Sequence, residues 1–408
     1  MAEPRDSRLL HRVIIQNYKS IRECDVTLGP LTFLVGPNGS GKSNFLDALR
    51  FVSDALSGSI EQAFRSRGGT AEVCHKRRDL FSYEIGIRLE FLLPSGDAGH
   101  YAFSIDTAGN SSAVLREQCS VASISTGGAE HFYKVARGEV THSSLDVTPA
   151  AMGDRLLLAS LSGIPAFRPV FDALSGMVFY DLQPQVLREL QPPGPGDVLL
   201  RDAANLPSVL DLLASEFPSV KTRVEEYLRG IVPDLVGVVP RSLGPRRTIQ
   251  FVQRPADSEL PAFFYSSSMS DGTLRALAIL LALFQVGNGA GPLLIGLEEP
   301  ETALHPAAAE VLLDSLREAA ESRQIVVTSH SPDLLDAGKV SDAEMLAVIS
   351  SGGATSIGRI DDASRSVLQD GLFAPGELLR MDHLRPGVLP VLTLNPGILF
   401  DEPAGTNA

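Results

Sequence analysis

The chain has 408 residues, of which 44% are apolar and 21% charged, the composition of an ordinary globular protein. Its formal net charge of −14 argues against a protein coated in nucleic acid, because phosphate binding relies on a basic surface, although a local groove stays open. We expect a cytoplasmic protein with no membrane contact, since the most apolar run, 276–284, is far short of the roughly 20 residues of a membrane span and the first residues show no signal-peptide pattern.

The chain opens with short strands around a glycine-rich loop. Alternation predicts a strand over His11–Tyr18, and an apolar run predicts a second over Leu31–Val35. Apolar residues at helical spacing then predict an amphipathic helix over Lys42–Leu56. Strand, glycine loop and helix in this order are the context that a phosphate-binding loop requires.

The pattern of apolar residues changes twice in the middle of the chain. Short alternating runs separated by turns over 82–140 predict an antiparallel meander. We then expect a helical region over 151–161, a strand over 177–180 and a second helical stretch over 198–227. Cys24, Cys74 and Cys119 are scattered through and before this region, which favours three reduced thiols over a metal site.

The last part of the chain returns to alternating helices and strands. Helices are expected over 274–285 and 306–322, and short apolar strands over 292–297, 325–328 and 345–349. Continuous apolar strands of this length indicate a parallel sheet that is covered on both faces.

The segment Gly-Pro-Asn-Gly-Ser-Gly-Lys-Ser over 36–43 matches the Walker A pattern completely. Its glycines let successive backbone N–H groups converge on phosphates at the positive end of the following helix. We expect Lys42 to reach the β- and γ-phosphates of ATP and the Ser43 hydroxyl to ligate Mg²⁺. The residues expected to bind the nucleotide here are Gly36, Pro37, Asn38, Gly39, Ser40, Gly41, Lys42, Ser43 and Asn44.

A second motif ends the apolar run Leu293–Glu299, which reads as a Walker B strand with Glu298 where Asp is commoner. A carboxylate at the end of a buried strand is costly unless it faces a cation or water. We therefore expect Glu298 to hold Mg²⁺ through its water shell and Glu299 to orient or deprotonate the attacking water. Glu301 is a third carboxylate nearby, and we assign no chemistry to it.

Two further motifs are candidates for contact with phosphate groups. Ser268–Thr273 resembles the signature loop of ATP-binding-cassette (ABC) ATPases, in which Ser270 and the N–H of Gly272 would bind phosphate; a plain helix cap is the alternative. His330 stands just past the apolar strand over 325–328 and looks like a switch histidine that contacts the γ-phosphate. We count Glu299, Lys42 and His330 as the candidate catalytic residues.

The order of these motifs, with Glu-Glu-Pro-Glu-Thr-Ala-Leu-His-Pro over 298–306 and Thr-Ser-His-Ser-Pro over 328–332, resembles the ABC-type ATPase heads of the RecF, SMC and OLD group. It looks closest to stand-alone bacterial AAA-family ATPases without a TOPRIM domain. The opening Asn-Tyr-Lys-Ser-Ile over 17–21 is similar to the start of that group, where it lies near the nucleotide, so Lys19 and Ser20 join the expected ATP-binding residues.

The resemblance implies an α/β fold, a P-loop NTPase of the ABC-ATPase head type with an antiparallel β subdomain and a helical insertion. We divide the chain accordingly, in this order: an ATPase core over 1–60 and 265–375, a β-rich insertion over 61–180, a helical or lid insertion over 181–264 and a C-terminal extension over 376–408. The resemblance itself is strong over 10–60 and 265–350.

Membership of that group would imply a head-to-head dimer with ATP between the subunits, so that Ser270 and Gly272 of one chain face the γ-phosphate bound by Lys42 of the other. Nucleotide state would then control DNA or a separately encoded nuclease or other effector, in genome maintenance or anti-phage defence. The alternatives are a nucleotide-gated binding switch with little turnover and, less favoured, a transporter ATPase subunit.

Some residues depart from the group pattern or fit more than one role. His305 stands where the D-loop often carries Asp, and Gln183 is a weak candidate for the Q-loop glutamine. Two arginine-rich clusters could line a nucleic-acid groove or could be solvated surface charge. The first cluster comprises Arg65, Arg67, Lys76, Arg77 and Arg78, and the second comprises Arg241, Arg246, Arg247 and Arg254.

Overall fold

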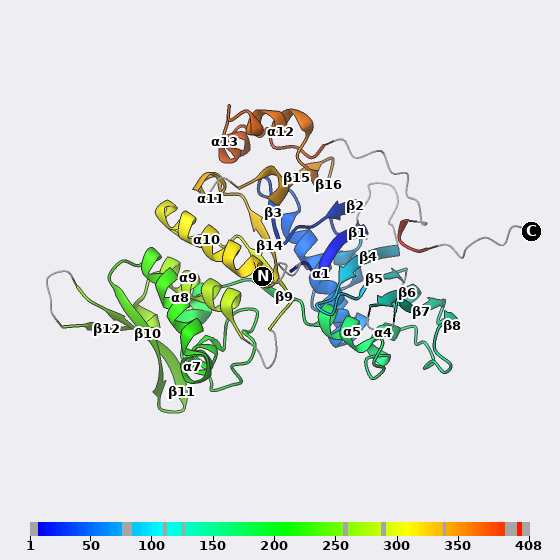
Figure 1. Ribbon diagram of the computed structural model, residues 1–408, viewed down its shortest axis with the longest axis horizontal. Helices are drawn as coiled ribbons and strands as arrows, with labels where there is room; N and C mark the ends of the chain where they lie inside the picture. The colour runs from blue at the N-terminus through cyan, green and yellow to red at the C-terminus, as the bar shows by residue number, and fades with distance from the viewer. Residues whose placement is uncertain are drawn as a thin grey trace, which may run out of the picture.

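A computed structural model gives the structure of the chain. It describes residues 7–75, 84–108, 112–124, 127–255, 260–286, 291–337, 340–387 and 398–401. One mixed sheet of 13 strands runs through the molecule, in the order β8-β7-β6-β5-β4-β1-β2-β16-β15-β3-β14-β13-β9, and a separate sheet has three strands. Figure 1 shows the antiparallel end of the large sheet on one side of the molecule and the small sheet on the other.

The antiparallel half of the large sheet confirms the predicted meander, which runs from β4 to β8. β1 pairs with β2 on one side and with β4 on the other, so the meander continues the sheet that carries the phosphate loop. The strands of this half are β1 (Leu10–Tyr18), β2 (Ile21–Thr27), β4 (Glu84–Leu92), β5 (Ala98–Asp106), β6 (Ala113–Ser123), β7 (Ala129–Ala136) and β8 (Glu139–Ser143).

The parallel half contains the strands that precede the predicted motifs. β15, β3, β14, β13 and β9 lie side by side and are all parallel, while β16 returns antiparallel to β15 and meets β2. The carboxyl ends of parallel strands meet at one edge of a sheet, so the loops that follow these strands gather there. The bounds are β3 (Leu31–Val35), β9 (Val178–Tyr180), β13 (Leu294–Glu298), β14 (Gln324–Ser329), β15 (Met345–Ser351) and β16 (Ala354–Arg359).

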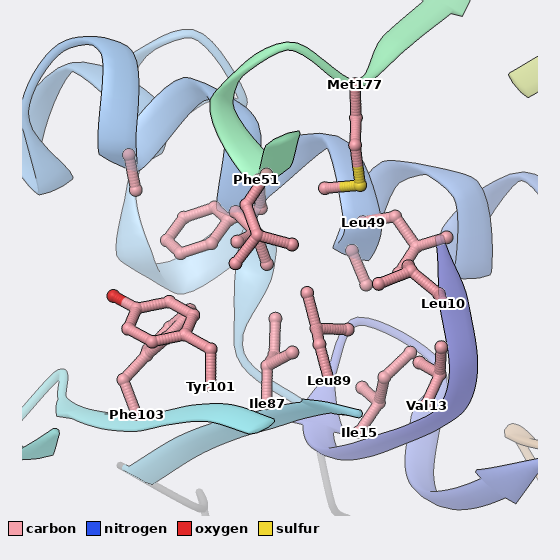
Figure 2. Packing of buried hydrophobic residues seen from close by; sticks show 14 of the residues in the cluster. Leu10, Val13, Ile15, Leu49, Phe51, Ile87, Leu89, Tyr101, Phe103 and Met177 are labelled. Atoms are coloured by element: carbon pink, nitrogen blue, oxygen red, sulfur yellow. The ribbon is translucent and has the colours of Figure 1, made fainter. Parts of the chain in front are cut away.

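Helices cover both faces of the parallel strands, as the apolar strand pattern predicts. One face packs against α1 (Lys42–Ser57), and Figure 2 shows Leu49 and Phe51 of α1 pointing toward Ile87 and Leu89 of β4 in the same core. The other face packs against α9, α10 and α11. These helices span Asp271–Phe284, Ala309–Ala320 and Pro332–Ala337, with the 3-10 turn η2 (Pro306–Ala308) before α10.

The insertion after β9 differs from the single helical stretch expected over 198–227. Residues 198–205 are not helical, and Pro218 starts a second helix directly after the first. A three-stranded antiparallel sheet follows. It was not predicted, because its strands lack the regular apolar alternation on which a strand prediction relies. The elements are α6 (Pro184–Arg188), α7 (Leu206–Glu216), α8 (Pro218–Ile231), β10 (Leu235–Leu243), β11 (Arg246–Gln253), β12 (Ala262–Tyr265) and η1 (Ser266–Ser268).

Short helices complete the fold. The helical region expected over 151–161 was mostly wrong, since only four residues there are helical; Gly153 and the polar residues beside it favour turns. The remaining elements are α2 (Ile60–Arg65), α3 (Thr70–Val73), α4 (Leu157–Ser160), α5 (Arg168–Ser175), η3 (Asp342–Glu344), α12 (Asp362–Gln369) and α13 (Pro375–Arg380).

Cys24, Cys74 and Cys119 are buried free thiols, as expected. In the first arginine-rich cluster, Arg67 is buried and paired with Asp47 and Asp54 instead of facing solvent, and residues 76–78 lie outside the described residues. Within the part of the chain that the structure describes, no helix combines the length and apolar character needed to cross a membrane.

Candidate nucleotide site

The phosphate loop, residues 36–43, joins β3 to α1 and depends on glycine at its last turn. Gly41 has φ +104°, and a Cβ there would lie 2.1 Å from Oγ1 of Thr355, so no other residue fits. The Thr355 hydroxyl donates to the carbonyl of Ser40 at 2.8 Å, and the Ser20 hydroxyl lies 2.7 Å from Thr355 Oγ1. The loop is therefore braced from outside by β16 and by the β1–β2 turn.

Lys42 lies inside this loop. Its side chain is buried, and its ammonium donates hydrogen bonds to the carbonyls of Gly36 at 2.8 Å and Pro37 at 3.0 Å. Burial lowers the pKa of Lys42, while the nearby carboxylates of Glu299 and Glu301 oppose that shift. The positive charge thus lies between the phosphate loop and the acidic end of β13.

The structure brings Ser43 and Glu298 together. Burial raises the pKa of Glu298, and a hydrogen bond with the Ser43 hydroxyl opposes the shift. Asp181, the first residue after β9, raises the pKa of Glu298 further through its negative charge, and Arg201 works against it. The sequence analysis did not select Asp181, although it follows a predicted strand just as Glu298 does.

Ser43 and Glu298 supply a hydroxyl and a carboxylate oxygen, both ligands that Mg²⁺ accepts. Among the described residues, no group of three or more His, Cys, Asp or Glu side chains is arranged to hold a metal ion without help. Mg²⁺ in nucleotide sites takes one or two protein oxygens and completes its shell with phosphate oxygens and water. A hydroxyl and a partly desolvated carboxylate at the foot of a phosphate loop fit that requirement.

Glu299 and His330 face each other at the ends of the neighbouring strands β13 and β14. His330 Nδ1 lies 3.1 Å from Glu299 Oε1, and both side chains are about one third exposed, although the Nδ1 atom itself is buried. Glu299 has φ +42°, a rare conformation for a residue with a side chain, and its N–H donates to the Thr328 carbonyl at 3.0 Å.

Glu301, to which we assigned no chemistry, supports the histidine loop. It is largely buried, accepts a hydrogen bond from the Ser329 hydroxyl at 2.7 Å and lies 3.3 Å from the donating N–H of His330. Burial raises the pKa of Glu301, and these hydrogen bonds oppose the shift. Its carboxylate therefore fixes the backbone at the position where β14 ends.

The β1–β2 turn lies against the phosphate loop, where the resemblance places Lys19 and Ser20. The Asn44 amide donates to Ser20 Oγ at 2.6 Å, and the Lys19 ammonium pairs with Asp47 of α1 at 2.5 Å. A cavity of about 460 Å³ opens on this side of the loop. It is lined by Lys19, Ser20, Arg67, Glu72, Cys74, His75 and Gly353.

The signature segment caps α9 and packs on the loop after β13 of the same chain. Ser270 Oγ accepts a hydrogen bond from the N–H of Thr273 at 3.2 Å, so the helix-cap alternative correctly describes its contacts within one chain. A Cβ on Gly272 would lie 2.4 Å from the carbonyl of Ala303, which explains the glycine. Arg188 of α6 pairs with Asp271 and donates to the Met269 carbonyl at 2.8 Å.

The contacts given for His305 and Gln183 do not involve the nucleotide site. His305 Nδ1 accepts a hydrogen bond from the N–H of Ala307 at 3.2 Å and so caps its own turn. Gln183 is exposed and directly precedes α6. Thr355 and Arg188 were also missed by the sequence analysis, because each acts on a motif that is distant in sequence.

With this geometry in place, comparison with known proteins defines the class. Residues 9–135 match the model described as "AAA ATPase domain", and residues 200–336 match "AAA domain, putative AbiEii toxin, Type IV TA system". The chain carries AAA-type ATPase domains and is homologous to RecF, OLD nuclease and SMC proteins, which confirms the resemblance drawn from the motifs.

Individual matches are distant and partial. The DNA replication and repair protein RecF of Magnetococcus marinus is 32% identical over 118 residues, covering 29% of this chain and 30% of the relative. The OLD nuclease of Thermus scotoductus is 38% identical over 58 residues, covering 14% and 10%. The chain thus spans less than a third of these relatives.

A solved structure extends the likeness to most of the fold. An SMC head bound to the C-winged helix domain of ScpA superposes with a TM-score of 0.53 at 14% identity, covering 86% of this chain and 96% of the head. The predicted fold class, an ABC-ATPase head with a mixed α/β architecture, is confirmed.

Proposed function

We propose that the chain binds ATP with Mg²⁺ and hydrolyses it as a head-to-head dimer whose nucleotide state controls DNA or a separately encoded effector such as a nuclease. Genome maintenance or anti-phage defence would be the setting. The proposal rests on three features that lie together at the carboxyl ends of β3, β13 and β14. Lys42 lies inside the phosphate loop, the Ser43 hydroxyl bonds to Glu298, and Glu299 lies beside His330.

Each side chain has one task in this mechanism. Lys42 supplies a positive charge to the β- and γ-phosphates from inside the loop. Ser43 and Glu298 would hold Mg²⁺, which withdraws negative charge from the phosphates when bound. Glu299 orients the attacking water and accepts its proton, and His330, whose Nδ1 lies 3.1 Å from Glu299 Oε1, faces the γ-phosphate.

Ser270 and Gly272 would complete the site of a second copy. They lie at the N-terminus of the 14-residue helix α9, where helix dipole and free N–H groups favour an anion. Within one chain, Gly272 packs against Ala303 in the loop after β13, whereas Lys42 hydrogen-bonds to its own phosphate loop. The signature segment and Lys42 therefore have different partners within one chain. Homology to RecF and SMC proteins supports a shared site of this kind.

The test is Glu299→Gln beside the matched surface variant Glu310→Gln. We expect the first to retain ATP binding, to lose turnover by about 100-fold or more and to accumulate an ATP-bound dimer, measured as mass in solution. Glu310 is exposed at the start of α10, so its variant should hydrolyse ATP normally. Normal turnover by Glu299→Gln would contradict the catalytic assignment.

A mixing experiment tests the shared site. Lys42→Ala and Ser270→Arg should each be inactive alone, because one damages the phosphate loop and the other the signature segment. A mixed dimer contains one undamaged pair, so turnover should reappear when the two inactive proteins are combined. Absence of recovery would argue for sites that are complete within one chain.

A further inference from the structure

The small sheet β10–β11–β12 has an unusual composition for this acidic chain. Its strands contain Arg241, Arg246 and Arg247 and neither Asp nor Glu, although the whole chain has a net charge of −14. Figure 1 shows the sheet at the edge of the molecule, on the side of α7 and α8 and away from β8. The sequence left open whether this local positive charge lines a nucleic-acid groove or is solvated surface charge.

One face of this sheet belongs to the protein core. Val238 of β10 and Ile249 and Phe251 of β11 are buried in the same apolar cluster as residues of α7 and α8. Side chains alternate along a strand, so the residues between these point the opposite way. The outward residues are Val239, Arg241, Arg246, Thr248, Gln250, Val252, Phe263 and Tyr265, with Phe263 opposite Val252 and Tyr265 opposite Gln250. Thr248 is buried, so this part of the face is covered.

The outward face carries aromatic rings that solvent reaches. Phe263 is 57% exposed and Tyr265 is 39% exposed, and both lie on the edge strand β12. Gln250 is opposite Tyr265 in the strand register, and its Oε1 accepts a hydrogen bond from Arg241 Nε at 2.8 Å. Neighbouring strands lie about 4.8 Å apart, which sets β10 and β12 about 10 Å from each other.

The arginines divide between the two faces. Arg247 points inward and pairs with Asp211 of α7 at 2.9 Å, so it belongs to the packing of the sheet. Arg246 is exposed, and one of its guanidinium N–H groups donates to the Leu190 carbonyl at 2.9 Å, which fixes the side chain near the start of β11. Arg241 and Arg246 are therefore the cations that a ligand on the outward face would meet.

We propose that this outward face binds single-stranded nucleic acid, with bases stacked on Phe263 and Tyr265 and phosphates on Arg241 and Arg246. Exposed aromatic rings beside cations are how proteins hold single strands without reading sequence. A duplex hides the faces of its bases, so the rings favour a single strand. The inference rests on the proposed function, since it names the ligand class and its place.

The position of this face connects it to the nucleotide site. Only η1 and Met269 separate Tyr265 from Ser270 along the chain. The Ser266 hydroxyl also lies 3.0 Å from the Thr248 hydroxyl of β11, which joins the turn to the sheet. A strand of nucleic acid on β12 would therefore rest against the segment that caps α9.

The experiment measures binding of a fluorescently labelled oligo-dT of about 20 nucleotides by anisotropy, with and without ATP. We expect Phe263→Ala with Tyr265→Ala to weaken binding by about tenfold or more, because each lost stacking contact is substantial. Arg241→Glu should weaken binding and reduce the slope of log affinity against log salt by about 0.7. Phe373→Ala and Arg155→Glu are the controls, since Phe373 is 40% exposed and Arg155 is also exposed, both on other elements.

Several results would overturn the inference. The first is that the wild-type protein binds no oligonucleotide, and the second is that the control variants weaken binding as much as the test variants. The third is that the matching duplex binds more tightly than the single strand. The fourth is that the test variants change only the mass of the protein in solution. The last result would make the face a protein interface. Binding of a fluorescent ATP analogue is measured in parallel, because failure there rejects the proposed function and failure of the oligonucleotide alone rejects only this inference.

Discussion

The hydroxyl of Thr355 donates a hydrogen bond of 2.8 Å to the carbonyl of Ser40, although 315 positions separate the two residues. Since that hydroxyl has one hydrogen, the Ser20 hydroxyl donates to Thr355 Oγ1 at 2.7 Å, and the Asn44 amide donates to Ser20 at 2.6 Å. A directional chain of hydrogen bonds therefore encloses the phosphate loop.

Thr355→Val keeps the shape of the side chain and removes this hydroxyl. The Ser40 carbonyl is left without its donor and the Ser20 hydroxyl without its acceptor, which costs about 1–3 kcal/mol for a buried pair. We expect the affinity for a fluorescent ATP analogue to fall by about tenfold. Thr222→Val, on the exposed side of α8, is the control, and equal affinities for the two variants would show that the chain of bonds does not shape the loop.

Arg188→Ala should separate nucleotide binding from assembly. Arg188 contacts both Asp271 and the Met269 carbonyl, so its loss loosens the signature segment and leaves the phosphate loop intact. We expect unchanged ATP affinity but about tenfold lower turnover and less ATP-dependent dimer. Arg188→Lys should restore only part of this, because an ammonium cannot reproduce the forked geometry of a guanidinium. Loss of ATP affinity in Arg188→Ala would instead assign the residue to the nucleotide pocket.

Glu298→Gln tests the metal assignment through stability and pH. Burial raises the pKa of Glu298 above its usual 4.5, so the protonated carboxyl group stabilises the metal-free fold below pH 4.5, and this contribution is lost as pH rises through the folded pKa and the buried group ionises. At pH 7 without Mg²⁺ the variant should therefore unfold at a higher temperature than the wild type. Added Mg²⁺ and ATP should stabilise the wild type and have a smaller effect on the variant.

The same pKa shift predicts how ATP binding responds to acid. Mg²⁺-dependent binding by the wild type should decline at a pH above that expected for a solvent carboxylate, because Glu298 takes up its proton earlier. A profile with no loss until pH 4.5, or a variant that is less stable without metal, would contradict the assignment.

Glu117→Gln should destabilise the antiparallel half. The buried carboxylate of Glu117 accepts four hydrogen bonds, from the hydroxyls of Tyr101 and Tyr133 and the N–H groups of Leu157 and Leu158, at 2.6–3.0 Å. Burial raises the pKa of Glu117 and these donors oppose the shift. An amide turns one acceptor into a donor, and we expect a loss of about 2–4 kcal/mol in urea unfolding.

The control for this variant is Glu130→Gln on the neighbouring strand. Glu130 is exposed and accepts one hydrogen bond from Ser120, so its variant should lose less than about 1 kcal/mol. Similar losses for the two variants would mean that Glu117 is not the anchor between β6 and α4.

Strand and motif positions near the phosphate loop could be predicted from the sequence, because each is specified by adjacent residues. The strand over Leu31–Val35 and the helix beginning at Lys42 agree with the structure, since apolar periodicity and a glycine loop are local signals. The insertion was harder: β10, with Pro240 and Arg241 inside it, resembles no standard strand pattern, and its formation depends on packing against α7 and α8.

Chain order alone predicted that the phosphate loop, the two glutamates at the end of one strand and the histidine just past another belong to one nucleotide site. Only the tertiary structure decided how they are held: Thr355 braces the loop, Glu301 fixes the histidine loop and Arg188 holds the signature segment. The physical reason is that hydrogen bonds and ion pairs act over a few ångströms of space. Parallel strands from distant parts of the chain bring these side chains to one edge of the sheet, and no spacing in the sequence records that distance.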